Sequence, residues 1–134
     1  MTLEQVNQKL STQLYRVSRI LLGGGEDDRD DSVTFVFDGE ALRITDNPSC
    51  CETRYFRFEN DDRKMVLGSI LLGIEVVECD SIPAAYGDHD VQQFVLRTTN
   101  GVYVMSSHNE HSGYYGGFNL HYEWNTTIPQ DVGE

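Results

Sequence analysis

The feature that most constrains the fold is a two-residue alternation of apolar and polar side chains, which recurs along the chain from residue 33 onward. Its clearest members stand at the two ends of this region: Val33, Phe35 and Phe37, then Phe118, Leu120, Tyr122 and Trp124. Alternation with a period of two is typical of strands that bury one face. We therefore expect residues 33–124 to form a mostly antiparallel sheet.

Turn residues divide this region into strands. Asp38-Gly39 and Asn100-Gly101 are pairs that suit tight hairpin turns. The second pair predicts a hairpin between Val91–Thr99 and Val102–Ser107, and further strands are expected at Cys51–Phe58 and Ser69–Cys79, with loops at 59–64 and 83–90. The total is about six or seven strands, arranged as a sandwich or a half-barrel.

The N-terminal segment has a different period. Thr2 and Gln5 form a capping-box pattern, and apolar residues follow at spacings of three and four: Leu3, Val6, Leu10, Leu14, Val17 and Leu21. This predicts an amphipathic helix that ends at Gly23-Gly24-Gly25 and packs on the protein's own sheet. The same segment also fits a heptad pattern, which would allow two copies of the helix to form a homodimer. The a and d positions of that heptad would be Leu3, Val6, Leu10, Gln13, Val17 and Ile20.

The expected class is α+β, with four regions along the chain. They are an N-terminal helix over 1–25, an acidic linker over 26–32, the β domain over 33–124 and a flexible tail over 125–134. The acidic run after the glycines sets the linker apart, because like charges repel each other and stay solvated.

Composition narrows the classes of function. The 134 residues suit one domain, and 22 acidic against 10 basic side chains give a net charge of −12. Direct nucleic-acid binding is therefore disfavoured, while a protein partner with a basic surface would be attracted.

The longest apolar stretch, residues 65–77, is short and interrupted, so we expect no membrane segment. Three cysteines form no closed disulfide set, which favours the cytoplasm.

Acidic loops and paired tyrosines are the candidate protein-binding residues. They are Asp27, Asp28, Asp30, Asp31, Asp61, Asp62, Tyr114 and Tyr115. The tyrosines flank turn glycines, where exposed aromatic rings suit a protein interface. Ordinary solubilising charge is the alternative interpretation of the carboxylates.

A small-ligand site is the second hypothesis. Guanidinium groups and an aromatic ring could together hold a signalling nucleotide, and the candidates are Arg54, Arg57, Arg97 and Tyr115.

Metal binding and catalysis have weaker support. Thiols and imidazoles are present at Cys50, Cys51, Cys79, His108, His111 and His121, but no Cys-x-x-Cys pair exists. Candidate acids and bases are scattered over Glu52, Glu75, Asp88, His89, Asp90 and His108, and no motif brings them together. We expect no metal, no cofactor and no enzymatic activity.

Three short motifs carry a resemblance: Cys50-Cys51-Glu52, Leu71-Leu72-Gly73-Ile74-Glu75, and the His111–Gly117 turn with its Gly-Tyr-Tyr-Gly-Gly end. Over residues 46–122 the chain resembles an uncharacterised small-domain family found mainly in bacteriophages and prophages, which leaves the helix and the linker outside. That family brings no established activity. The resemblance implies a phage-type accessory protein, by analogy one that binds and inhibits a nucleic-acid-handling or anti-phage defence protein in the bacterial cytoplasm.

Overall fold

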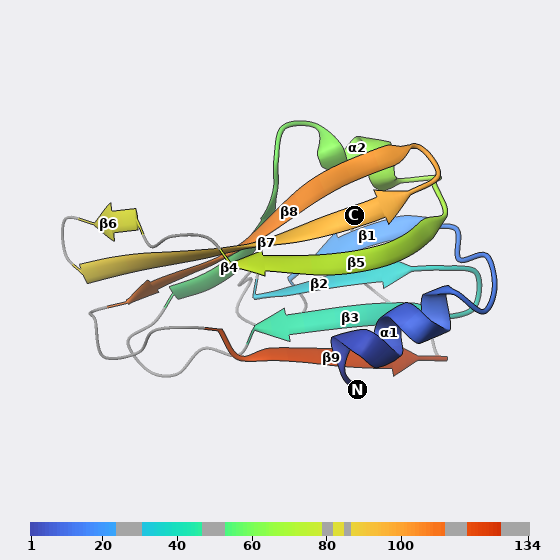
Figure 1. The fold of residues 1–134 in the computed structure, drawn as a ribbon, viewed down its shortest axis with the longest axis horizontal. Coiled ribbons are helices and arrows are strands. Elements are labelled where there is room, and N and C mark those ends of the chain that lie inside the picture. Colours follow the sequence, from blue (N-terminus) through green and yellow to red (C-terminus); the bar gives the residue numbers. More distant parts are fainter. Residues whose placement is uncertain (24–30, 47–52, 79–81, 85–86, 112–117, 127–134) are drawn as a thin grey trace.

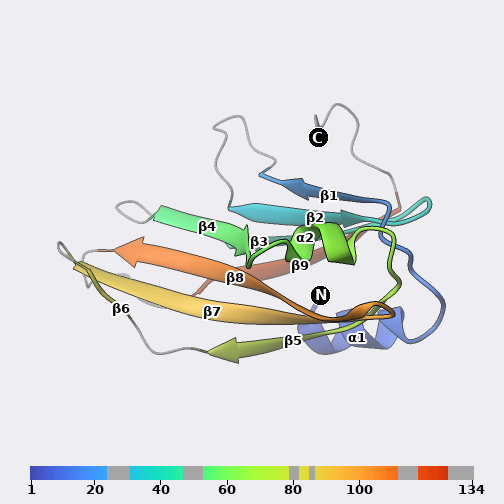
Figure 2. The same ribbon diagram turned by 90° about the horizontal axis from the view of Figure 1, so that it is seen from above.

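Two antiparallel sheets lie face to face in the computed structural model, and a helix covers each of two open sides (Figures 1 and 2). The structure describes residues 1–23, 31–46, 53–78, 82–84, 87–111 and 118–126. The sheets are not closed into a barrel. The chain is therefore an α+β protein with an N-terminal helix, as the sequence predicts.

The first sheet has the strand order β1-β2-β3-β9. Its strands are β1 (Arg19–Leu22), β2 (Ser32–Val36), β3 (Ala41–Asp46) and β9 (Leu120–Asn125). The second sheet has the order β4-β8-β7-β5, with β6 added along β7. Its strands are β4 (Thr53–Phe58), β5 (Leu71–Glu78), β6 (Ile82–Ala84), β7 (Gly87–Thr98) and β8 (Gly101–His111). The helices are α1 (Leu3–Leu10) and α2 (Asp62–Val66).

The core lies between the sheets, where the alternating apolar side chains of both meet. Phe35, Leu42 and Ile44 come from the first sheet, and Phe94 and Met105 from the second; each is completely buried. The β9 residues Leu120, Tyr122 and Trp124 pack against this core while remaining partly exposed. The period-two pattern therefore identifies the inward faces correctly.

Each helix bridges the two sheets at a different side. On α1, Val6 and Leu10 enter the core, Asn7 is hydrogen-bonded to Ile74 of β5, and the Lys9 ammonium lies 5.0 Å from the centre of the Trp124 ring on β9. On α2, Asp62 accepts a hydrogen bond from the Val104 N–H of β8 at 2.8 Å, and Arg63 donates one to the Ile20 carbonyl of β1 at 2.6 Å.

The prediction of a helix up to the triple glycine is wrong beyond Leu10. The hydroxyls of Ser11 and Thr12 donate to the Gln8 and Lys9 carbonyls at 2.6 and 2.7 Å, which supplies the last turn with side-chain partners. The chain then leaves the helix, and residues 19–22 pair with β2 as a strand. The proposed heptad is therefore not formed, and the helical part of its stripe packs on the protein's own core.

Other boundaries also differ from those expected. Helix α2 occupies part of the predicted 59–64 loop, and β6 with the start of β7 occupies part of the predicted 83–90 loop. Ser32, assigned to the linker, begins β2, and Asn125, assigned to the tail, ends β9. Both glycine-turn hairpins are confirmed. Residues 24–30 and 127–134, which hold most of the expected linker and tail, lie outside the described residues.

Neither helix in the described part of the chain has the length and apolar character needed to cross a membrane.

Candidate functional site

A groove of about 470 Å³ runs beside α2, between β4 and the end of β1. Its walls combine cationic and aromatic side chains with few acids; the lining is Leu22, Tyr55, Phe56, Arg57, Phe58, Asn60, Asp61, Arg63 and Lys64. Three of the ten basic side chains of this acidic protein lie here beside one carboxylate. The groove is therefore locally basic on a molecule of net charge −12.

A short turn sets the shape of this groove. Asn60 takes a positive φ of 49°, a left-handed conformation that Asn tolerates, and directs the chain from β4 into α2. Helix α2 is then fixed by the bonds of Asp62 to β8 and of Arg63 to β1, and by the buried Val66. Arg63 therefore reaches the groove from a fixed position.

Arg57 and Lys64 are the cations of the groove whose side chains make no hydrogen bond or ion pair within the described part of the chain. Arg57 projects outward from β4, and Lys64 is exposed on α2. Cations without protein partners are available to an anionic ligand, and a guanidinium can bind a phosphate or carboxylate through two hydrogen bonds.

The three arginines of the small-ligand hypothesis are not brought together. Arg54 and Arg57 stand three residues apart on one strand, so they face opposite sides of the sheet. Arg54 is 8% exposed and bound to Asp46, and Arg97 lies on β7 opposite Gly73 of β5. Of the three, only Arg57 lines the groove. Sequence reasoning missed Arg63 and Lys64 because it placed them in a loop.

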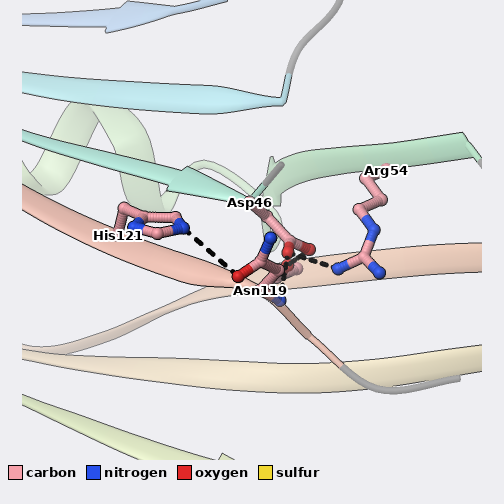
Figure 3. Close-up of polar contacts among 5 residues, drawn as sticks. Asp46, Arg54, Asn119 and His121 are labelled. Atoms are coloured by element: carbon pink, nitrogen blue, oxygen red, sulfur yellow. Dashed lines mark hydrogen bonds and ion pairs between the residues drawn. The ribbon is translucent and has the colours of Figure 1, made fainter. Parts of the chain in front are cut away.

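Arg54 belongs instead to a buried polar junction between the sheets (Figure 3). Asp46 is completely buried and accepts hydrogen bonds from Arg54 Nη1 at 2.5 Å, the Asn119 N–H at 2.7 Å and the Ser107 hydroxyl at 3.3 Å. Burial raises the pKa of Asp46, against the lowering effects of the Asn119 bond and the Arg54 charge. The junction joins β3, β4, β8 and the chain before β9, which is a structural role.

The described acidic candidates do not form one cluster: Asp61 and Asp62 are neighbours at the start of α2, and Asp31 precedes β2. Asp31 is half-buried, and its carbonyl accepts a hydrogen bond from the Asp46 N–H at 2.9 Å. Asp61 lies exposed at the groove, while Asp62 is held by Val104. Asp27, Asp28, Asp30, Tyr114 and Tyr115 lie outside the described residues, as do Cys50, Cys51 and Cys79.

A second polar cluster lies on the outer face of the second sheet, next to the groove. His89 Nε2 and His108 Nδ1 are 2.8 Å apart, and His108 Nε2 lies 3.0 Å from the Ser106 hydroxyl. Tyr55 stacks on the His108 ring with 4.7 Å between centroids. Burial, followed by the charge of His89, lowers the pKa of His108. The described residues contain no group of three or more side chains arranged to hold a metal.

The fold and the groove together define a class: a small two-sheet α+β domain with a locally basic groove. The chain belongs to the family described as Domain of unknown function (DUF7448), which matches residues 5–120. The match includes most of α1, so the helix belongs to the family domain, contrary to the expected limits of 46–122. No curated protein and no solved structure matches the chain significantly.

Proposed function

We propose that this protein is a non-enzymatic binding protein that holds a small phosphorylated ligand, of the nucleotide class, in the basic groove beside α2. The observation that carries the proposal is the convergence of Arg57, Arg63 and Lys64 around one groove of a strongly acidic molecule. Its volume of about 470 Å³ lies within the range of small-molecule sites. No cofactor is required.

The contacts of the groove residues indicate a different role for each side chain in ligand binding. Arg63 is oriented by its bond to the Ile20 carbonyl, whereas the side chains of Arg57 and Lys64, which bond to none of the described residues, would donate to phosphate oxygens. Tyr55, which lies on the same face of β4 as Arg57, adds aromatic surface for a base or another planar group. Burial, followed by the Glu110 carboxylate, raises the pKa of Tyr55, so its hydroxyl stays protonated at neutral pH.

The test is a thermal-shift and calorimetric screen with pyrophosphate, mononucleotides and cyclic dinucleotides. A ligand at 100 times its Kd should add about 2.7 kcal/mol to the free energy of unfolding. Arg57→Gln and Lys64→Gln should each weaken binding by roughly 10- to 150-fold, because each removes a charge-assisted hydrogen bond of about 1.5–3 kcal/mol. Arg97→Gln is the matched control, since it removes the same charge outside the groove. Absence of binding across the panel, or equal losses in all three variants, contradicts the proposal.

Docking to a basic host protein is the second candidate, and the charge of −12 favours it. Exposed carboxylates on both sheets, among them Glu75, Glu78, Glu110 and Glu123, would attract such a partner. In this version the protein is a phage-type accessory factor that blocks a nucleic-acid-handling or defence protein in the bacterial cytoplasm.

Salt dependence tests this second candidate. Capture of a specific host protein from lysate should fall steeply between low and physiological salt, because screening shortens electrostatic attraction to about 8 Å. Glu75→Gln/Glu78→Gln should weaken the capture, with Gln8→Glu as a control that adds charge elsewhere. Capture that is absent or indifferent to salt argues against electrostatic docking.

A further inference from the structure

The two imidazoles on the outer face of the second sheet converge on one point. His89 lies on β7 and His108 on β8, and the register pairs His89 with Glu110 and Val91 with His108. The histidines are therefore diagonal neighbours on one face, with Nε2 of the first 2.8 Å from Nδ1 of the second. Both side chains are half-buried.

The hydrogen bonds of Ser106 fix which nitrogen of His108 carries the proton. The Ser106 hydroxyl has one hydrogen and donates it to Glu59 Oε1 at 3.0 Å or to the Arg57 carbonyl at 3.2 Å. Its oxygen must then accept from His108 Nε2–H, at 3.0 Å. Consequently His108 Nδ1 carries a lone pair, and that lone pair faces His89.

The surroundings hold His108 in this orientation. Tyr55 stacks on its ring with an interplanar angle of 4°, and Ser106, which anchors the other ring nitrogen, is 1% exposed. Histidines that bind metals commonly donate the second ring N–H to a fixed outer partner in this way. Three charged side chains act on the His108 ring besides His89. The carboxylates of Glu59 and Glu110 favour a bound cation there, and the guanidinium of Arg57 opposes one.

We propose that His89 and His108 form a binding site for a divalent transition metal of the class that prefers imidazole, such as Zn²⁺, Ni²⁺ or Cu²⁺. The metal takes the lone pairs of His89 Nε2 and His108 Nδ1; His89 moves its proton from Nε2 to Nδ1, so both ligands are neutral and no proton is released. Water completes the coordination. Since the described residues supply two such ligands, binding is exchangeable rather than structural.

The geometry requires a small adjustment. Two nitrogens at about 2.0–2.1 Å from a tetrahedral zinc ion are roughly 3.3 Å apart. The present separation of 2.8 Å must therefore widen by about half an ångström, which small side-chain rotations provide. This inference does not rest on the ligand proposed for the groove.

The experiment is a titration of the reduced full chain with Zn²⁺, followed by long-range ¹H–¹⁵N spectra of the histidine rings. Without metal, His108 should appear as the Nε2–H tautomer; with metal, the Nε2 resonance of His89 and the Nδ1 resonance of His108 should shift together with one apparent affinity. These ring signals distinguish binding at the two histidines from any binding of zinc to the thiols of the three cysteines, because a thiolate is also a zinc ligand.

Variants complete the test. His89→Gln should abolish the response of His108, and His108→Gln that of His89, whereas His121→Gln should leave both unchanged; amide spectra verify that each variant is folded. The proposal is overturned if neither ring responds to millimolar Zn²⁺, or if each ring responds as before when the other is replaced.

Discussion

Asn7 of α1 and Ile74 of β5 are joined by a pair of hydrogen bonds. Asn7 Nδ2 donates to the Ile74 carbonyl at 2.8 Å, and Asn7 Oδ1 accepts from the Ile74 N–H at 2.8 Å. β5 stands at the end of the strand order β4-β8-β7-β5, and the N–H and carbonyl of Ile74 are directed toward α1. The amide supplies the two bonds that a neighbouring strand would make, and it fixes α1 over the side of the sandwich.

Replacing Asn7 should therefore cost more than its position on a helix suggests. Asn7→Ala leaves the N–H and the carbonyl of Ile74 without this partner, with an expected loss of about 1–3 kcal/mol in the free energy of unfolding. Asn7→Asp keeps the acceptor and should lose less. Urea denaturation measures both, with the exposed Gln8→Ala as the control on the same helix. A loss in Asn7→Ala no larger than in Gln8→Ala would show that the bonds contribute nothing net.

Removing only Arg54 from the Asp46–Arg54 pair should destabilise the protein more than replacing both residues together. Arg54→Met leaves Asp46 buried without its cation, which should cost about 3–5 kcal/mol at neutral pH. The double variant Asp46→Asn/Arg54→Met should recover much of the loss, because a neutral amide still accepts from the Asn119 N–H.

The pH dependence of Arg54→Met gives an independent check. Burial already raises the pKa of Asp46, and removal of Arg54 takes away one lowering effect. A folded pKa above the unfolded value of 3.8 means that stability is present at low pH and is lost as the pH rises through the folded pKa. The cost of Arg54→Met should consequently shrink on acidification, as measured by urea denaturation at several pH values. A cost that is constant with pH would exclude a charged Asp46 as its cause.

Much of the strand content was predictable because strands such as β3 and β7 alternate between buried and more exposed side chains. Phe35, Leu42 and Phe94 occupy the inward positions that the alternation indicates. The extent of the first helix was not predictable, since Leu14, Val17 and Leu21 continue its apolar spacing. Here the pairing of β1 with β2 determines the structure, and Leu14 is 76% exposed. Local spacing cannot reveal a strand partner that lies elsewhere in the sequence.

The site residues likewise include some contacts that the sequence could predict and others that it could not. The Asn100-Gly101 turn sets the register of β7 and β8, so counting back from it places His89 diagonally to His108. Their contact could have been derived, had the strand been extended past Val91. The groove could not have been derived from the sequence. It depends on the hydrogen bond from Arg63 to the Ile20 carbonyl of β1, and these two residues are 43 positions apart in the chain.

Gly73 and Arg97 provide a prediction about close packing. A Cβ added at Gly73 would lie 2.5 Å from Arg97 Nη2 and 3.2 Å from its Cζ. These atoms end a flexible side chain, so the guanidinium can move away, and Gly73→Ala should cost less than about 1 kcal/mol. In an Arg97→Ala background the same change should stabilise by about 0.4–1 kcal/mol, because alanine restricts the unfolded chain. A double-mutant cycle in urea measures the coupling; a large cost that persists without Arg97 would place the strain in the backbone instead.

His108 should make the protein less stable in mild acid. Burial and the charge of His89 lower its pKa below the ordinary value of 6.5, so the unfolded chain binds this proton more strongly than the folded one. The stabilisation is therefore complete above pH 6.5 and is lost as the pH falls from there through the folded pKa. Urea denaturation between pH 7.5 and 5 should show the decline, and His108→Gln should reduce it while the exposed His121→Gln should not. Equal slopes in the parent protein and His108→Gln would mean that other groups control stability in this range.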